Sequence, residues 1–233
     1  MTALLVVCGF AITVVHAQQP AADTLLVKIR SAIRSAKYQD ALKDANDVLT
    51  KNPADVLAWC LKGEAQTRLK DTSAALESFD KAIQADKTSI NAVVGKANAL
   101  AESKKEAEAQ GLLRQAISMT PSSATDYLAR GAAFRSLAQY DKAIADYDEA
   151  MKLDSTFAEA QLNKGMVFWH KGDFAGAIPF FTAAIKLDPN FVEALANRGA
   201  AYRKKGDIES AIADVSPCLR SCRKFCIALS TIS

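Results

Sequence analysis

The sequence lacks any block of charge of one sign. Its 233 residues include 29 lysines and arginines and 26 aspartates and glutamates, and the net charge of +3 is spread along the chain. Proteins that bind nucleic acid usually gather positive charge on one face or along one helix. The charge pattern therefore predicts no nucleic-acid partner, and mixed runs such as residues 104–106 are typical of a solvated helix face.

Histidine is also scarce, which limits the chemistry that the chain can perform. There are two histidines, and only His170 lies outside the apolar N-terminal segment. A nucleophile needs a base beside it, so an enzyme built on this sequence would have to depend on His170. No glycine-rich phosphate-binding loop is present either. We therefore expect no enzymatic activity, no cofactor and no small-molecule substrate.

Long hydrophobic runs are absent as well. The uncharged segment Ala3–Val15 is shorter than the roughly 20 residues that a helix needs to cross a bilayer, so we expect no stable membrane span. It ends in Val15, His16 and Ala17, with small residues where signal peptidase requires them. Residues 1–17 are therefore predicted to be a signal peptide, and the mature chain, beginning near Gln18, to be exported to the periplasm or secreted. A buried N-terminal helix is the alternative.

What the sequence does contain is an internal repeat of 34 residues without insertions. The predicted units are 22–55, 56–89, 90–123, 124–157, 158–191 and an incomplete unit 192–215. The twentieth place of every unit is alanine, and the eighth place is glycine or alanine in five of the six units. The alanines are Ala41, Ala75, Ala109, Ala143, Ala177 and Ala211.

Each unit has the pattern of a helical hairpin. Apolar places recur three or four residues apart on either side of a polar or glycine break such as residues 171–173, which predicts two amphipathic helices. Two helices can cross closely where one side chain is short, and larger residues then fill the flanking space. The small eighth and twentieth places are therefore interpreted as helix-crossing positions.

The pattern resembles the tetratricopeptide repeat (TPR). An aromatic residue stands at the fourth place in two units and at the eleventh in three, and proline stands at the thirty-second in three; the residues are Trp59, Tyr127, Phe134, Phe168, Tyr202, Pro53, Pro121 and Pro189. The resemblance implies an all-α fold, a right-handed superhelical solenoid of antiparallel helix hairpins. It also implies that the first helix of each hairpin lines a concave surface.

The pattern breaks near the C-terminus. Pro217 falls inside the second helix of the sixth unit, so we expect this helix to end or kink near Val215. Residues 216–233 are predicted to be an atypical tail that contains Cys218, Cys222 and Cys226. Their spacing does not match a zinc site, and we expect no metal ligation. A truncation or a change of reading frame would explain such a tail.

The resemblance also implies which places face the concave surface, namely the second, fifth, sixth, ninth, twelfth and thirteenth of each unit. The candidate peptide-binding residues at these places are Asn98, Arg135, Leu162, Asn163, Trp169, Asn197 and Arg203. Asn163 and Asn197 match an asparagine ladder that holds a peptide backbone in some members of the family. The Lys and Asn constellation that holds chaperone C-termini in other members is absent.

These observations predict an interaction scaffold or adaptor whose concave groove binds a protein, through an extended or helical segment. The alternative hypothesis is a regulatory or targeting arm of a larger, truncated multidomain protein. A purely structural role, in which the asparagines only cap or solvate helices, is the alternative to peptide binding by these residues.

Overall fold

The computed structural model describes residues 19–221, and within this range the chain forms twelve α-helices and no strand. The helices are α1 (Gln19–Arg34), α2 (Tyr38–Lys51), α3 (Val56–Arg68), α4 (Thr72–Ala85), α5 (Ile90–Glu102), α6 (Glu106–Ser118), α7 (Ala124–Ser136), α8 (Tyr140–Leu153), α9 (Ala158–His170), α10 (Phe174–Leu187), α11 (Val192–Lys205) and α12 (Ile208–Ser221). Consecutive helices pack against each other, so the fold is an all-α solenoid of helix hairpins.

The small residues allow the two helices of a hairpin to approach closely. A Cβ atom added to Gly131 of α7 would lie 2.6 Å from the ring of Tyr147 in α8, and one added to Gly165 of α9 would lie 2.6 Å from the ring of Phe181 in α10. Tyr147 and Phe181 are fully buried. Each of these two hairpins is therefore held by an aromatic ring packed on the bare backbone of the opposite helix.

The turn inside each hairpin has the same backbone conformation in all six hairpins. One residue per turn has a positive φ angle, and these residues recur every 34 positions: Ala36, Lys70, Lys104, Ala138, Gly172 and Gly206. Glycine adopts this conformation without the steric cost that other residues pay. The last two turns thus have the residue best suited to their geometry.

Ion pairs connect the hairpins at a second periodic position. The seventh place of each unit is basic, and in α7 Arg130 donates to both carboxylate oxygens of Asp146 in its own unit, at 2.8 and 2.7 Å. In α9, Lys164 instead donates to Asp148 of the preceding unit at 2.6 Å. These contacts stabilise both the hairpins and the junctions between them.

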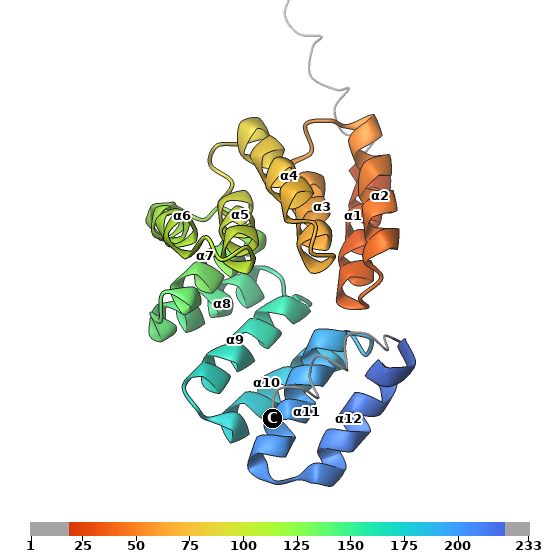
Figure 1. Ribbon diagram of the computed structural model, residues 1–233, viewed down its shortest axis with the longest axis vertical. Helices are drawn as coiled ribbons and strands as arrows, with labels where there is room; N and C mark the ends of the chain where they lie inside the picture. The colour runs from red at the N-terminus through yellow and green to blue at the C-terminus, as the bar shows by residue number, and fades with distance from the viewer. Residues whose placement is uncertain (1–18, 222–233) are drawn as a thin grey trace, which may run out of the picture.

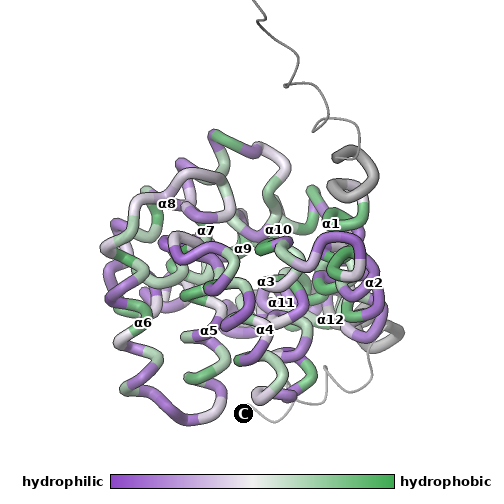
Figure 2. The backbone as a smooth tube through the Cα atoms, turned by 90° about the horizontal axis from the view of Figure 1, so that it is seen from above, coloured by the Kyte–Doolittle hydropathy of each residue, from purple (hydrophilic) through white to green (hydrophobic). Residues whose placement is uncertain are grey.

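The hairpins follow a tight curve that brings the two ends of the described chain together. In Figure 1 the helices run from α1, over α5 and α6 at the opposite side, to α11 and α12 below α1. Figure 2 shows hydrophilic and hydrophobic stretches alternating along nearly every helix, as expected for elements with one face on the core. The odd-numbered helices are the first helices of the hairpins, and they lie on the inside of the curve.

The last helix differs from the sequence-based expectation. The sequence predicts that this helix ends or kinks near Val215; α12 does not end there but continues through Pro217 to Ser221. A proline ring removes one backbone donor and leaves the hydrogen bonds of the other turns intact, so a helix can continue past it. The predicted signal peptide and the tail after Ser221 lie outside the described residues. None of the helices in the described range has the length and apolarity to cross a bilayer.

Candidate binding pocket

The first helices of all six hairpins surround a pocket of about 460 Å³. In the second unit its lining comprises the second, fifth, sixth, ninth, twelfth and thirteenth places, which are Leu57, Cys60, Leu61, Glu64, Thr67 and Arg68. The same places of the third and fourth units, on α5 and α7, also line it, with one exception in the fourth. The lining thus follows the repeat.

The wall of the pocket combines apolar and polar side chains. Leu57, Val94 and Leu162 supply apolar surface from α3, α5 and α9, while Asn91 and Asn98 present amides from α5. Apolar contact with a few polar groups is the usual composition of a binding pocket, and the volume is within the usual range for such sites. The pocket can therefore accept an amphipathic segment.

Ion pairs between the two ends of the chain close one side of the pocket. Arg34 of α1 lies 3.3 Å from Glu159 of α9, and its Nε atom lies 2.7 Å from the carboxylate of Asp188, the C-cap of α10. Arg68 of α3 lies 2.8 Å from Glu193 of α11. We call these five residues, together with Arg30, the clasp.

The clasp is partly protected from water, and apolar contacts extend it. The side chains of Arg34 and Glu159 are 16% and 18% exposed. The guanidinium of Arg30 lies 5.0 Å from the centre of the Phe157 ring, a distance typical of a cation–π contact. Ala36 packs with Val192 and Leu195 at the start of α11. The first and last hairpins therefore contact each other directly.

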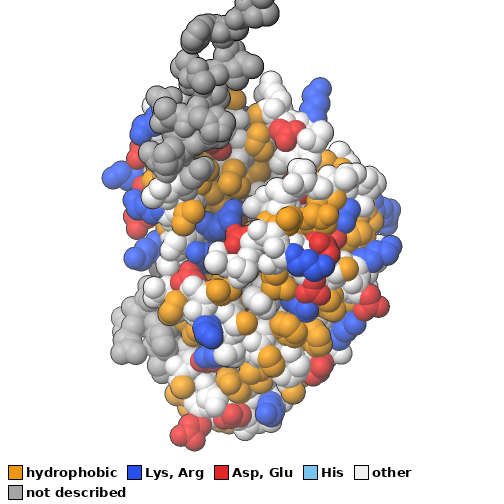
Figure 3. Space-filling view, turned by 180° about the vertical axis from the view of Figure 1, so that it is seen from behind, with side chains coloured by type: hydrophobic (Ala, Val, Ile, Leu, Met, Phe, Trp, Pro, Cys, Tyr) orange, Lys and Arg blue, Asp and Glu red, His pale blue; other side chains and the backbone are white. Residues whose placement is uncertain are grey.

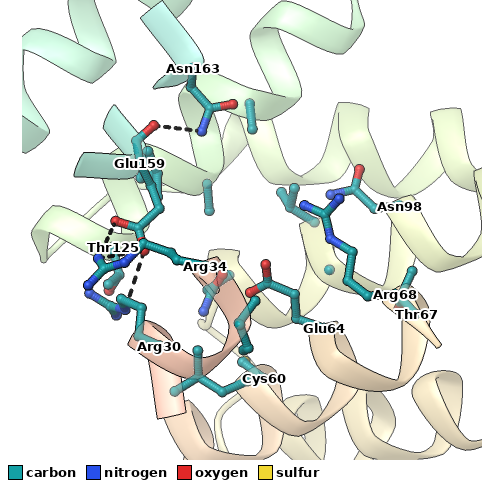
Figure 4. A pocket seen from close by; sticks show the side chains of 18 of the residues that line it. Arg30, Arg34, Cys60, Glu64, Thr67, Arg68, Asn98, Thr125, Glu159 and Asn163 are labelled. Atoms are coloured by element: carbon teal, nitrogen blue, oxygen red, sulfur yellow. Dashed lines mark hydrogen bonds and ion pairs between the residues drawn. The ribbon is translucent and has the colours of Figure 1, made fainter. Parts of the chain in front are cut away.

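Glu64 is a charged side chain of this region to which the described residues offer no hydrogen bond or ion pair. In Figure 4 its carboxylate lies between Arg34 and Arg68, and no dashed line connects it to either. The surrounding protein displaces water, which raises the pKa of Glu64; Arg68 opposes this effect, and the carboxylates of Glu159 and Glu193 add to it. Glu64 is half-buried, so its carboxylate remains accessible from the pocket.

A second group of polar side chains surrounds Arg135 at the end of α7. Its Nη1 atom lies 3.2 Å from Nε2 of His170, and the His170 ring stacks parallel to that of Tyr140. Partial burial and the neighbouring Arg135 lower the pKa of His170. A neutral imidazole accepts a hydrogen bond from Arg135, so His170 here orients a guanidinium.

The structure brings together four of the seven candidate residues from the sequence. Asn98, Arg135, Leu162 and Asn163 line the pocket. Trp169, Asn197 and Arg203 are not among its lining residues, and the Trp169 ring packs edge-on against Phe174 with ring centres 4.8 Å apart. The side-chain amide of Asn163 donates to the backbone carbonyl of Glu159 at 2.9 Å, which leaves its oxygen available.

The sequence-based selection omitted the charged residues of the clasp and Glu64. Arg30, Arg34, Glu64, Arg68 and Glu159 occupy the same concave places as the residues that were selected. Their position in the repeat was the signal that could have identified them as lining residues. Their pairing was not visible, because partners such as Arg34 and Glu159 are 125 residues apart in sequence.

The described cysteine in the pocket wall is a packing residue. Cys60 is buried, and burial raises the pKa of its thiol to about 12, so the reactive thiolate is not formed at neutral pH. Within the described part of the chain, no three His, Cys, Asp or Glu side chains are placed to hold a metal ion. Cys222 and Cys226 lie outside that part.

The chain belongs to the tetratricopeptide repeat family. Family models described as tetratricopeptide repeat match residues 26–90 and 128–190, more than half of the chain, and a further one matches residues 180–213. Members of this family are generally non-catalytic scaffolds for protein interaction. No curated protein matches the sequence.

Solved structures share the fold at low sequence identity. A chain in the crystal structure of the APC/C hetero-tetramer Cut9-Hcn1 matches with a TM-score of 0.57 and 21% identity, over 86% of this chain and 40% of that chain. A human IFIT1 dimer with PPP-AAAA matches with a TM-score of 0.60 and 17% identity, over 79% of this chain and 46% of that chain. This chain thus spans less than half the length of either protein.

Proposed function

We propose that this protein is an adaptor whose central pocket binds an extended segment of a partner protein. The observation that carries the proposal is the pocket itself, which is lined by all six first helices and combines apolar side chains with the amides of Asn91 and Asn98 on α5 and Asn163 on α9. An extended peptide offers backbone donors and acceptors that such amides satisfy, and apolar side chains that leucines accept.

The charge of the pocket supports a peptide over a nucleic acid as the ligand. Four arginines line it, Arg30, Arg34, Arg68 and Arg135, and they are matched by four glutamates, Glu64, Glu102, Glu159 and Glu193. Nucleic-acid sites need an excess of positive charge to neutralise phosphates. Figure 3 likewise shows acidic and basic side chains interspersed on the face that it presents.

A displayed library of random octapeptides, selected on the immobilised full chain, tests the proposal. A selected peptide would be titrated by calorimetry into the wild type, into Asn98→Ala combined with Asn163→Ala, and into Asn197→Ala. Asn98 and Asn163 line the pocket, whereas Asn197 does not. Each lost pocket hydrogen bond should cost about 1 kcal/mol or more, so the double variant should bind at least about 10-fold more weakly.

The Asn197→Ala variant separates this proposal from the asparagine ladder that the sequence suggests. If the ladder holds the peptide, the Asn197→Ala variant should also bind more weakly than the wild type. If the pocket holds it, Asn197→Ala should bind like the wild type. Failure to enrich any peptide, or equal affinity of all three proteins, would contradict binding in the pocket. Circular dichroism would show that the variants remain folded.

We further propose that the protein acts after export, with residues 1–17 removed as a signal peptide. The support is the apolar segment that ends at Ala17 with small residues at the cleavage site. N-terminal sequencing of the native protein is the test. A first residue of Gln18 is expected, and a protein that begins at Met1 and stays in the cytosol would overturn this proposal.

A further inference from the structure

The charges of the clasp and the neighbouring Glu64, taken together, do not balance. Three guanidinium groups meet four carboxylates there; the residues are Arg30, Arg34, Arg68, Glu64, Glu159, Asp188 and Glu193. Of the other two charged lining residues, Glu102 pairs with Lys70, and Arg135 contacts His170 at the end of α7. The clasp and Glu64 together thus have one carboxylate more than they have cations.

The pairing pattern identifies Glu64 as the carboxylate in excess. Arg34 pairs with Glu159 and Asp188, Arg68 pairs with Glu193, and Arg30 is 4.0 Å from Glu159. Arg68 lies one helical turn after Glu64 on the same face of α3, but its guanidinium is directed to Glu193. Every cation of the clasp is therefore engaged by another acid.

The surroundings of Glu64 suit the end of a long cationic side chain. Thr67 donates its hydroxyl proton to the carbonyl of Gly63, which leaves the hydroxyl oxygen free to accept, and the amide of Asn98 lies on the facing helix α5. Leu57 and Leu61 offer apolar surface to an aliphatic stem. A lysine or arginine side chain matches this combination of acceptors and apolar wall.

A metal ion fits the site less well. Ca²⁺ takes six to eight oxygen ligands, usually including several carboxylates. Glu159 and Glu193 already pair with arginines, which leaves one free carboxylate. A single ammonium or guanidinium group needs one carboxylate and one or two neutral acceptors, which the site has.

We propose that Glu64 binds a lysine or arginine side chain of the partner segment and that the pocket therefore selects basic peptides. This inference rests on the proposed function, because it names the ligand class of the same pocket. The ligand cation supplies the fourth positive charge, which the clasp and Glu64 together lack. Binding then gains a charge-assisted hydrogen bond in a partly dehydrated site.

A double-mutant cycle tests the pairing directly. The octapeptide library described above is first used to select a peptide that contains a lysine. The probes are then this peptide and a copy in which norleucine replaces the lysine. Both peptides would be titrated into the wild type and into Glu64→Gln. Each single change should weaken binding about 10-fold, and the two changes together should cost little more than one. Glu106→Gln, on the exposed start of α6, is the matched control and should leave affinity unchanged.

The outcomes separate this inference from the proposed function. Selected peptides without any preference for Lys or Arg would overturn the inference and leave peptide binding intact. So would strictly additive losses in the cycle, because additive changes do not interact. If the library yields no binding peptide at all, the proposed function itself fails, and this inference fails with it.

Discussion

At the scale of single residues, the charged side chains of the pocket differ in their effect on the fold. Most form ion pairs that stabilise it, and Glu64 does not. Arg34 and Arg68 each have acidic partners at 2.7 to 3.3 Å, whereas Glu64 forms no ion pair with any residue that the structure describes. A carboxylate that is held away from water without a partner disfavours the folded state. Residues that cost stability in this way are candidates for binding, since a ligand can provide what the fold does not.

The first prediction concerns the stability of Glu64→Gln as a function of pH. Burial raises the pKa of Glu64 above its ordinary value of 4.5. The folded state therefore holds the proton more tightly than the unfolded chain, and stability is lost as the pH rises from about 4.5 through the folded pKa. Glutamine stays neutral throughout.

Urea unfolding at a series of pH values measures this difference. At pH 7, Glu64→Gln should be more stable than the wild type, and the gap should close as the pH falls to 4. Glu106→Gln on exposed α6 shows what the loss of a solvated carboxylate does. A Glu64→Gln protein that is less stable than the wild type at pH 7 would mean that Glu64 is paired in solution.

At the scale of the helical hairpin, the sequence contains nearly all the information. Gly131 and Gly165 stand at the small eighth place, and the rings of Tyr147 and Phe181 that pack against them belong to the same units. This is the close helix crossing, with larger residues filling the flanking space, that the small places predict. The end of the sixth unit was harder to predict. A proline such as Pro217 weakens a helix locally, and packing along the rest of α12 can still maintain it.

The second prediction compares two glycines in helix interiors. In Gly131→Ala the new Cβ atom would lie 2.6 Å from the ring of the buried Tyr147, whereas in Gly111→Ala it meets nothing within 4 Å. We expect Gly131→Ala to lose about 1 to 3 kcal/mol of unfolding free energy through overpacking. Gly111→Ala should gain up to about 1 kcal/mol, because alanine favours the helix.

Thermal or urea unfolding measures the change in unfolding free energy of each variant. Because Gly111 is exposed to solvent, Gly111→Ala reports the effect of helix propensity alone. Equal effects of the two substitutions would contradict the close crossing of α7 and α8.

At the scale of the whole molecule, the curvature of the solenoid determines which helices meet around the pocket. The repeat predicts that first helices face inward, but it does not fix how tightly successive hairpins turn. That curvature depends on small rotations at each junction, which add up along the array. The contacts of α1 and α3 with α9 and α11 depend on this sum, so local pattern could not reveal the clasp.

The third prediction concerns closure of the two ends. Arg34→Gln removes the shared partner of Glu159 and Asp188 and leaves two partly buried carboxylates facing each other. We expect the ends to separate, so the radius of gyration from small-angle X-ray scattering should increase. Arg114→Gln, an exposed position on α6, is the control and should not change it.

High salt should also increase the radius of gyration of the wild type, but less than Arg34→Gln does. At 1 M salt the screening length falls to about 3 Å, and partly buried pairs are screened less than exposed ones. If the radius of gyration of Arg34→Gln equals that of the wild type at low salt and also at 1 M salt, the clasp does not hold the two ends together. The apolar contacts of Ala36 with Val192 would then be sufficient.

Site-specific photo-crosslinking in native extract tests most directly whether the pocket is the binding surface. A benzoylphenylalanine would replace Ala101, an exposed residue of α5 that lines the pocket, or Gln115, an exposed residue of α6 outside it. We predict that the Ala101 protein is crosslinked to a partner and that mass spectrometry maps the crosslink to a short segment containing Lys or Arg. Crosslinks from Gln115 but not from Ala101 would place the partner outside the pocket and contradict the account.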